Sequence, residues 1–446
     1  MKKVLIIFGK VSAVILIAFV LLEIGLRLFP KVIPVKLLVE FREELRADIA
    51  QRLDLMTIHD TVVLDRNDGG PLVRIFRPST KVTFKIEDLG AVRTVVMDKI
   101  GFCNPPQNDY DMQTIDIITL GDSFTWCQSV SPEETWTSQL SFRLGRSTYN
   151  LGRQGIGPYE YLQIFRRFGV QKSPRIVIMN IYAGNDLRDA VQYQLYRDAA
   201  AKGQRSPGLP PSPCTTMPRH WCRLCSLLQS GPMGRYSYAF NLAVAAADSI
   251  RGRTVKRLSR FRSVLGEDDL KPNFHYRVIL SRDVIFNSSN TDGDEVKHAR
   301  CLRNHEINLE VFTGSLRAFV ELSRQHGFVP VVTFTPSAHT AYDASVVFDD
   351  PALGDLMPQF HREQGDFLKT KGRELGYVFI DLTSSLQTAA RSNNADLLYY
   401  PSSLHLTPRG HAVVAEALTT AMENLGFAST ARPGAIKTSK GRRDSE

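Results

Sequence analysis

The chain has 446 residues, of which 43% are hydrophobic and 23% are charged, so most of it is expected to fold around a large core. Its net charge of +9 is moderate and lies partly in the first three residues and in the tail at 437–443. No clustered basic stripe with interleaved aromatic residues is evident, which excludes nucleic-acid binding as the expected function, whereas a mild attraction to anionic glycans or lipid head groups is compatible with the charge.

The N-terminal segment, residues 1–30, is predicted to be a membrane anchor. Val4–Leu22 is apolar except for Lys10 and is long enough to cross a bilayer. Its uninterrupted part, Val11–Leu22, also has the length of a signal-peptide core, but no A-x-A-like cleavage site follows it, which favours an uncleaved anchor. Two lysines precede the segment and predict that the rest of the chain lies outside the cytoplasm.

Residues 31–110 are predicted to form a lead-in helix and a small strand-rich region. The mixed, amphipathic residues 31–60 are typical of a helix that leaves a membrane. Leu72–Phe84 and Ala91–Met97 show the short alternation of polar and apolar residues that favours strands.

The stretch Ile115–Trp126, with the sequence IDIITLGDSFTW, is predicted to be a buried strand followed by a turn. Gly-Asp-Ser breaks the apolar run, and the Ser-Pro-Glu-Glu of residues 131–134 is typical of a helix start. Open parallel sheets bind their ligands at the carboxyl edge, where such a turn places the hydroxyl of Ser123. Ser123 is therefore the candidate nucleophile.

Alternation of strands and helices predicts a parallel sheet built from two parts of the chain, residues 111–189 and residues 301–428. Residues 190–300 are irregular and are predicted to be an insertion at the active edge, where it shapes substrate access. Residues 429–446 are basic, contain few apolar residues and are predicted to be a disordered tail. Further predicted elements are strands at 147–151, 175–182, 276–286, 328–334 and 377–381, and helices at 158–170, 236–261, 306–326, 357–375 and 407–425.

Two groups of potential metal ligands lie in the insertion, and neither has the spacing of a known site class. Cys214, Cys222 and Cys225 lie near His220, but the C-x2-C pair has no second pair at zinc-finger spacing, so a local disulfide or free thiols are favoured. Asn290–Glu295 (NTDGDE) lacks EF-hand spacing and is predicted to be an exposed turn. No metal and no cofactor are predicted, and the six cysteines suit an oxidising compartment.

Four chemically distinctive positions follow predicted strands, so all four are expected to meet at one edge of the sheet. The hydroxyl of Ser123 needs a base, which His405 supplies, and the N–H groups of Ser123 and Gly155 with the Asn185 amide are predicted to form an oxyanion hole. Each position also has an ordinary structural interpretation: a common turn at Ser123, a positive φ at Gly155, a helix cap at Asn185 and an exposed loop at His405. His411 is the competing base.

Four motif blocks resemble those of the SGNH (GDSL) hydrolases. They are GDSFTW, the N-x-G-x-x-G of Asn150–Gly155, the GND of Gly184–Asp186 and the S-x-x-H-L-T-P-x-G-H of Ser402–His411. The resemblance covers about residues 100–426, apart from the insertion. It implies an α/β fold, a flavodoxin-like three-layer sandwich with a parallel sheet, and ester chemistry with the four roles given above. The leader also resembles that of membrane-anchored bacterial members, which implies a single-pass protein of the cell inner membrane with a periplasmic catalytic domain.

The chain departs from the family pattern at two places. The family usually has an aspartate three residues before the histidine, where this chain has Ser402, and nothing in the spacing brings the nearest upstream acid, Asp396, to the ring of His405. The group that orients the imidazole is therefore unassigned. Loss of the orienting carboxylate from a catalytic triad can lower the rate about 10⁴-fold when the histidine takes the wrong tautomer. Relatives often have other residues where Cys103 and Cys127 stand, and this departure suggests a disulfide that braces the nucleophile turn.

The expected function is that of a membrane-anchored, extracytoplasmic serine esterase or O-acyltransferase that forms an acyl-enzyme on Ser123. The expected substrate is an ester-bearing small molecule or an O-acetylated envelope polysaccharide. Two alternatives are a catalytically inactive carbohydrate-binding or assembly protein of the same fold and a phospholipid lipase. The lipase predicts a continuous apolar rim on the insertion.

Overall fold

The computed structural model describes residues 2–33, 45, 49, 61–63, 73–201, 236–244, 246, 275–280, 283–287, 292–392 and 396–427. The chain divides into two compact units, which are described separately. The first comprises Met1–Thr83 and Gln192–Asn273, and the second comprises Phe84–Val191 and Phe274–Glu446. The four candidate zinc ligands, the tail at 429–446 and nearly all of the helix predicted at 31–60 lie outside the described residues.

The first unit begins with helix α1, Lys2–Leu28, and a short 3-10 turn. Glu23 of α1 accepts hydrogen bonds from the Ser237 hydroxyl (2.9 Å) and from the backbone N–H of Ala239 (2.9 Å), so its carboxylate caps the helical segment that starts at residue 236. Strands β1 (Thr61–Val63) and β2 (Arg74–Phe76) pair antiparallel.

The membrane-spanning helix expected over Val4–Leu22 is not found. Within the described residues, no helix combines the length and the apolar character that crossing a bilayer requires.

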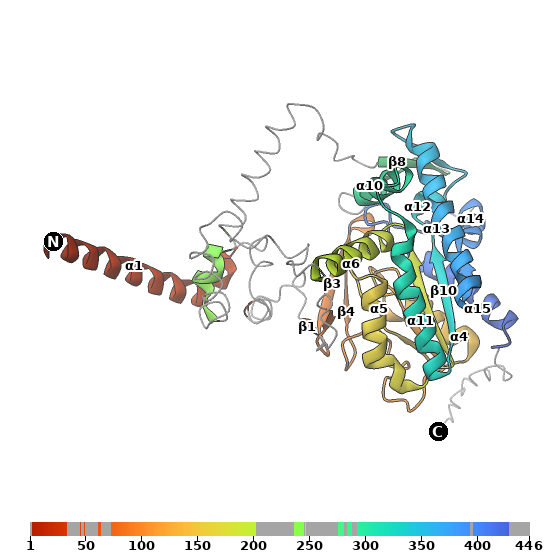
Figure 1. The fold of residues 1–446 in the computed structure, drawn as a ribbon, viewed down its shortest axis with the longest axis horizontal. Coiled ribbons are helices and arrows are strands. Elements are labelled where there is room, and N and C mark those ends of the chain that lie inside the picture. The colour runs from red at the N-terminus through yellow and green to blue at the C-terminus, as the bar shows by residue number, and fades with distance from the viewer. Residues whose placement is uncertain are drawn as a thin grey trace, which may run out of the picture. The chain divides into compact units, whose positions relative to one another are not determined.

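A five-stranded parallel sheet forms the centre of the second unit (Figure 1). Its strands, in chain order, are β5 (Ile117–Leu120), β6 (Thr148–Asn150), β7 (Ile176–Tyr182), β10 (Val329–Thr335) and β12 (Val378–Asp381). Their spatial order is β12-β10-β7-β5-β6. This is the flavodoxin-like order, whose direction of winding reverses between the first and third strands. The predicted α/β sandwich is therefore confirmed, and ligand binding is expected where β5 and β7 end.

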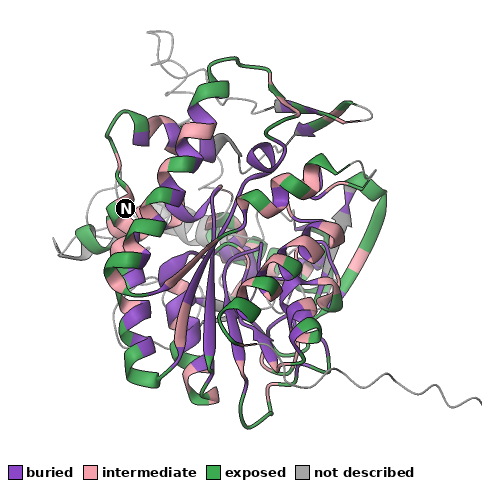
Figure 2. Cartoon of the chain, turned by 90° about the vertical axis from the view of Figure 1, so that its right-hand side faces the viewer, coloured by how far each residue is buried: buried purple, intermediate pink, exposed green. Residues whose placement is uncertain are grey.

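Helices cover both faces of this sheet and leave their polar sides exposed (Figure 2). Every residue of β5 and β7 is buried, because a parallel sheet is covered on both faces. The helix after β5 packs against the last helix of the chain, and the helix after β6 packs against the helix before β10. The helices of this unit are α4 (Trp136–Leu144), α5 (Pro158–Ile164), α6 (Asp186–Ala201), α10 (Asp292–Arg303), α11 (Thr313–His326), α12 (Ala338–Ala341), α13 (Leu353–Leu375), α14 (Thr383–Arg391) and α15 (Pro408–Asn424).

Several predicted boundaries are corrected by the structure. The single strand predicted at 276–286 is a hairpin of β8 (His275–Ile279) and β9 (Asp283–Asn287), and β8 also pairs with β11 (Val346–Phe348). The helix predicted at 158–170 ends at Ile164 and continues as one π-helical and one 3-10 turn. Short strands β3 (Lys81–Ile86) and β4 (Ala91–Val96) form in the strand-rich lead-in, close to the two alternating stretches. The helix α14 was not predicted, because its nine residues carry only a short apolar face.

Candidate active site

The turn after β5 holds Ser123 at the carboxyl edge of the sheet. The backbone carbonyl of Asp122 accepts N–H groups from Thr125 (3.2 Å) and Trp126 (3.0 Å), and its carboxylate accepts the N–H of Phe124 (2.9 Å). Only glycine fits at position 121, because an added Cβ would lie 2.0 Å from the Thr125 hydroxyl oxygen. The Gly-Asp-Ser sequence therefore builds a tight turn that places the serine hydroxyl beyond the end of the strand.

The imidazole of His405 meets this hydroxyl. The distance from its Nε2 to Ser123 Oγ is 2.9 Å, within hydrogen-bond range. The loop that carries the histidine is held at both ends, since Tyr400 N–H donates to the His405 carbonyl (2.8 Å) and Thr407 caps α15. Leu404, directly before the histidine, has a φ of 58°, a left-handed conformation that a leucine adopts only where its surroundings impose it.

Phe124 orients the imidazole from the side. Its ring stacks on His405 (centroids 5.1 Å apart, planes at 27°) and, on its other face, on Tyr182 (3.5 Å, 18°). No sequence motif predicts a role for Phe124. Its place directly after the nucleophile is the only signal that could have drawn attention to it.

Burial controls the protonation of His405. Loss of hydration lowers its pKa from 6.5 to about 4, and the Ser403 backbone carbonyl opposes that change only in part. Nδ1 has no partner that meets hydrogen-bond geometry within the described part of the chain, so the carbonyl acts on it at longer range. The ring is neutral at physiological pH, as a general base must be.

Ser402 stands where the family pattern has an aspartate, and it contacts a distant carboxylate. Ser402 does not reach the ring: its hydroxyl donates to Asp88 Oδ2 (2.5 Å), and its backbone N–H donates to the same carboxylate (3.2 and 3.3 Å). Asp88 therefore fixes the loop that carries His405 from a site 314 residues earlier in the sequence. Asp396 contributes its backbone carbonyl to Arg409, and no contact among the described residues brings its carboxylate to the imidazole.

Of the three residues predicted for the oxyanion hole, Ser123 and Asn185 line one cavity and Gly155 does not. Asn185 lines a small cavity beside Ser123, with a volume of about 30 Å³, and its amide also hydrogen-bonds the carboxylate of Asp122. An amide nitrogen has two N–H groups, so one is left for a substrate oxygen. Gly155 does not line this cavity. It has a φ of +67°, so its turn requires glycine whatever else its N–H does.

Two buried aspartates accompany the Ser123 turn: Asp122 belongs to the turn, and Asp186 is the first residue of α6. Burial raises the pKa of Asp122 to about 6, and burial together with the charge of Asp122 raises the pKa of Asp186 well above its usual range. Asp186 accepts hydrogen bonds from the Tyr161 hydroxyl (2.5 Å) and from the Tyr182 N–H (2.6 Å). Asp122 and Asp186 are the acidic residues of the GDS and GND motifs. The motifs could have drawn attention to these positions, but they do not reveal the protonation state of either carboxyl group.

His411, the competing base, has a structural role. It is buried, and its Nδ1 accepts the backbone N–H of Trp136 at 3.2 Å. The Trp136 indole N–H in turn donates to the Phe124 carbonyl (3.0 Å). His411 thus joins α15 to α4 behind the nucleophile turn.

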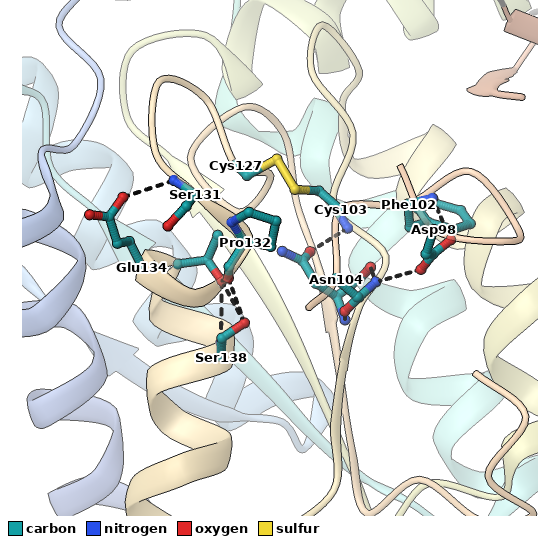
Figure 3. The surroundings of a disulfide bond; sticks show 12 residues. Asp98, Phe102, Cys103, Asn104, Cys127, Ser131, Pro132, Glu134 and Ser138 are labelled. Carbon is teal, nitrogen blue, oxygen red and sulfur yellow. Dashed lines mark hydrogen bonds between the residues drawn. A yellow bond between two sulfur atoms is a disulfide. The ribbon is translucent and has the colours of Figure 1, made fainter. Parts of the chain in front are cut away.

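The predicted disulfide between Cys103 and Cys127 is present, with its Cα atoms 6.1 Å apart (Figure 3). It ties the segment after the nucleophile to the loop that contains Asn104. The Asn104 side chain accepts from the N–H of Asn150 (2.8 Å) and donates to its carbonyl (3.0 Å). Asn150 then donates from its own side chain to the Thr125 carbonyl (2.7 Å), so the disulfide and two asparagines brace one turn.

Replacing both Cys103 and Cys127 with serine is expected to lower the free energy of unfolding by about 3 kcal/mol, because the closed loop of 24 residues restricts the unfolded chain. Urea unfolding followed by circular dichroism measures the difference. Replacing Cys301, a free and partly exposed cysteine, with serine is the matched control and should leave stability nearly unchanged. A loss below about 1 kcal/mol in the double variant would contradict the bracing role.

Metal ligation finds no support in the described part of the chain, where no group of three or more His, Cys, Asp and Glu side chains could hold an ion. Asp292 and Glu295, from the stretch with a weak resemblance to a calcium loop, belong to helix α10. The buried carboxylate of Glu295 accepts a hydrogen bond from Ser337 (2.7 Å) and lies 3.1 Å from Nε2 of His339.

Comparison with known proteins gives low similarities. No family model and no curated protein matches the chain. Among solved structures, the chain is similar to a member of the lipolytic protein G-D-S-L family from Veillonella parvula (11% identity, 69% of this chain and 98% of that one, TM-score 0.33). It is also similar to a catalytic mutant of an acetylxylan esterase from Geobacillus stearothermophilus (12% identity, 71% of this chain and 97% of that one, TM-score 0.33). A third similar structure is that of an alpha/beta hydrolase enzyme from the metagenome of Lake Arreo, Spain (11% identity, 71% of this chain and 98% of that one, TM-score 0.35).

The four motif blocks fall at the ends of the strands β5, β6 and β7 and before the last helix, as the resemblance requires. The strand order is that of a flavodoxin-like α/β sandwich, and these motifs together with the contact between Ser123 and His405 resemble the arrangement of the SGNH (GDSL) hydrolases.

Proposed function

We propose that the chain is a serine esterase or O-acyltransferase that works through an acyl-enzyme. The observation that carries the proposal is the 2.9 Å contact between a neutral, buried imidazole and the hydroxyl of Ser123, at the edge where open α/β sheets bind ligands. An inactive binding protein has no need of this arrangement.

The proposed first step transfers the acyl group to the enzyme. His405 Nε2 takes the proton of Ser123 Oγ while that oxygen bonds to the ester carbonyl carbon. Negative charge develops on the carbonyl oxygen, and the free N–H of Asn185 and the backbone N–H of Ser123 stabilise it. The ester bond breaks, the departing alcohol takes the proton from His405, and the acyl group remains on Ser123. Water or a sugar hydroxyl then accepts that group by the reverse sequence.

The cavity beside Ser123 favours a short acyl group. A volume of about 30 Å³ is only about twice what one water molecule needs, so it suits an acetyl group and not a long acyl chain. This argues against the phospholipid lipase. We therefore propose an O-acetylated polysaccharide or another acetyl ester as substrate, with hydrolysis or transfer decided by whether water is excluded from the acyl-enzyme.

We further propose an extracytoplasmic location at a membrane. The disulfide between Cys103 and Cys127 supports an oxidising compartment, since such bonds rarely persist in the cytosol. The apolar N-terminal sequence is the proposed means of attachment. Recovery of the full chain in the soluble fraction after cell lysis would contradict attachment without bearing on the esterase activity.

Fluorophosphonate labelling followed by peptide mapping tests the proposed function. The reagent modifies only an activated serine, so a single adduct on Ser123 is expected. Failure to label the folded protein, together with no turnover of p-nitrophenyl acetate, would favour the carbohydrate-binding or assembly protein instead.

The rate is expected to fall in acid with a midpoint near pH 4. The base must be neutral, and burial lowers the pKa of His405 to about 4, so its proton binds only well below the usual 6.5. The kcat/KM for p-nitrophenyl acetate, measured from pH 3.5 to 8, gives the midpoint. Folding must be followed in parallel, because the unfolded histidine takes up its proton at 6.5 and stability therefore falls as the pH drops from 6.5 toward 4. A midpoint at or above 6.5 would contradict a buried base.

Replacing Asp88 with alanine is expected to lower kcat about tenfold with little change in KM, because two hydrogen bonds to a carboxylate that hold the His405 loop are lost. Steady-state kinetics with p-nitrophenyl acetate measure this. The D88N variant keeps an acceptor oxygen and should lose less, and equal activity of wild type and D88A would show that the loop needs no such support.

A further inference from the structure

A second and much larger cavity opens at the carboxyl edge of the same sheet. Its volume is about 690 Å³, within the range of small-molecule sites. It lies among α12, α13 and α14, which follow or cover the strands β10 and β12 (Figure 1). Asp381, the last residue of β12, lines it. The candidate active site uses none of its residues.

The floor of this cavity carries a buried histidine with an incomplete set of hydrogen bonds. His361 is 7% exposed and stacks on Phe334 with the ring centroids 4.9 Å apart. Its Nε2 lies 2.9 Å from the hydroxyl oxygen of Thr383, while its Nδ1 has no partner within the described residues. A buried polar atom left unpaired is destabilising, so a ligand group that hydrogen-bonds Nδ1 is favoured. A hydroxyl suits either tautomer of the ring, because it both donates and accepts.

The walls combine aromatic rings with hydrogen-bonding side chains. Phe348 and Phe379 are half-buried and line the cavity. Helix α13 contributes three charged side chains to the lining, those of Arg362, Asp366 and Lys369. They are spaced by four and then three residues, so they lie on one face of the helix. All three are exposed, and neither cation forms an ion pair within the part of the chain that the structure describes.

This lining disfavours two common ligand classes. The N-terminus of α14 offers a phosphate little, because Asp381 already accepts the N–H of Thr383 (2.9 Å) there. The lining also holds three carboxylates, of which that of Asp343 is paired with Arg391, and these disfavour a doubly charged phosphate group. A lipid chain needs a continuous apolar wall, which the charged and amide side chains interrupt. What remains is a ligand with many hydroxyls and some apolar faces.

We infer that this cavity binds an oligosaccharide, whose C–H faces pack on Phe348 and Phe379 while its hydroxyls bond to the polar groups of α13 and the floor. The ends of β12 and β5 are three strand intervals apart, about 14 Å, so one polysaccharide chain could occupy this cavity and reach Ser123. That the bound glycan is also the substrate rests on the proposed function, whereas its binding does not.

Titration calorimetry of the full chain tests the inference directly. The S123A variant prevents turnover, and the probes are cellohexaose, N-acetylated chitohexaose and a galacturonate hexasaccharide, which are neutral, acetylated and acidic. Saturable binding of at least one is expected. Replacing Phe379 with alanine should weaken it at least about tenfold, and so should the exposed pair R362A and K369A. The R373A variant changes an exposed arginine of the same helix that lies outside the cavity and should bind as before.

The outcomes separate this inference from the proposed function. Absence of saturable binding for all three sugars, or binding that neither the F379A variant nor the R362A and K369A pair weakens, overturns the inference. The exposed pair keeps the test valid if F379A fails to fold, which thermal unfolding by circular dichroism reveals. Failure of the proposed function would appear in a different experiment, as a wild-type chain whose Ser123 is not labelled by the fluorophosphonate. The titrations use the S123A variant and do not depend on that result.

Discussion

Replacing Ser123 with alanine is expected to lower kcat for p-nitrophenyl acetate by at least about 10⁴-fold, because the oxygen that carries the acyl group is removed. A residual rate above that in water alone is expected from the remaining oxyanion donors, Asn185 among them. The fluorophosphonate adduct should disappear in the same variant. The fold should be preserved in this variant, since alanine removes one oxygen from a side chain that lies beyond the end of a strand.

The control for this variant is S384A, which removes an exposed serine from α14 and should retain full activity. Equal rates for wild type and S123A would show that the esterase activity does not come from this site. Such a result would favour the inactive binding or assembly protein, and the structure would then leave the contact between Ser123 and His405 without a function.

Replacing His405 with alanine is expected to cause a loss of similar size, since the serine then has no base within reach. The two losses should not add: the S123A and H405A double variant is expected to be about as slow as either single variant, because the two residues act as a unit. Steady-state kinetics of the four proteins measure this non-additivity. Additive losses would show that the residues act separately.

Added imidazole distinguishes loss of the base from a disturbed fold. It is expected to restore part of the activity of H405A and none of the activity of S123A, because the small molecule can fill the space left by the side chain and accept the serine proton. H326A, which changes an exposed histidine at the end of α11, is the control and should behave as wild type. A variant H405A with near-wild-type kcat would exclude His405 as the base.

The position of the candidate site follows from the winding of the sheet. The first strand, β5, lies between the second and the third, so the connections leave its carboxyl end in opposite directions. Ser123 and Asn185 follow β5 and β7, the two strands at this reversal, and His405 arrives from the loop before the last helix. The loop of His405 is itself held by Asp88 through Ser402. The carboxylate of Asp88 thus holds the loop that carries His405 through Ser402 and does not contact the imidazole itself.

The sequence by itself predicted the parallel sheet and its strands, and it singled out the candidate nucleophile Ser123, the candidate base His405 and the disulfide between Cys103 and Cys127. Apolar runs with the length of buried strands are local signals, and Gly-Asp-Ser at the end of such a run needs a tight turn whatever surrounds it. Cys103 and Cys127 could be paired because they flank one strand. His405 was distinguished from His411 only provisionally, since both stand in one motif and only packing separates a base from a structural partner of Trp136.

Only the tertiary structure decided the rest. The contact between Asp88 and Ser402 joins residues 314 positions apart, and no local pattern encodes it. The protonation of His405, Asp122 and Asp186 depends on burial, which arises when distant segments exclude water together. The large cavity beside β12 depends on how α12, α13 and α14 pack, and side chains spread over some fifty residues line it. Local sequence determines which elements form because their hydrogen bonds and apolar periodicity are local, whereas distances between elements are set by packing of the whole chain.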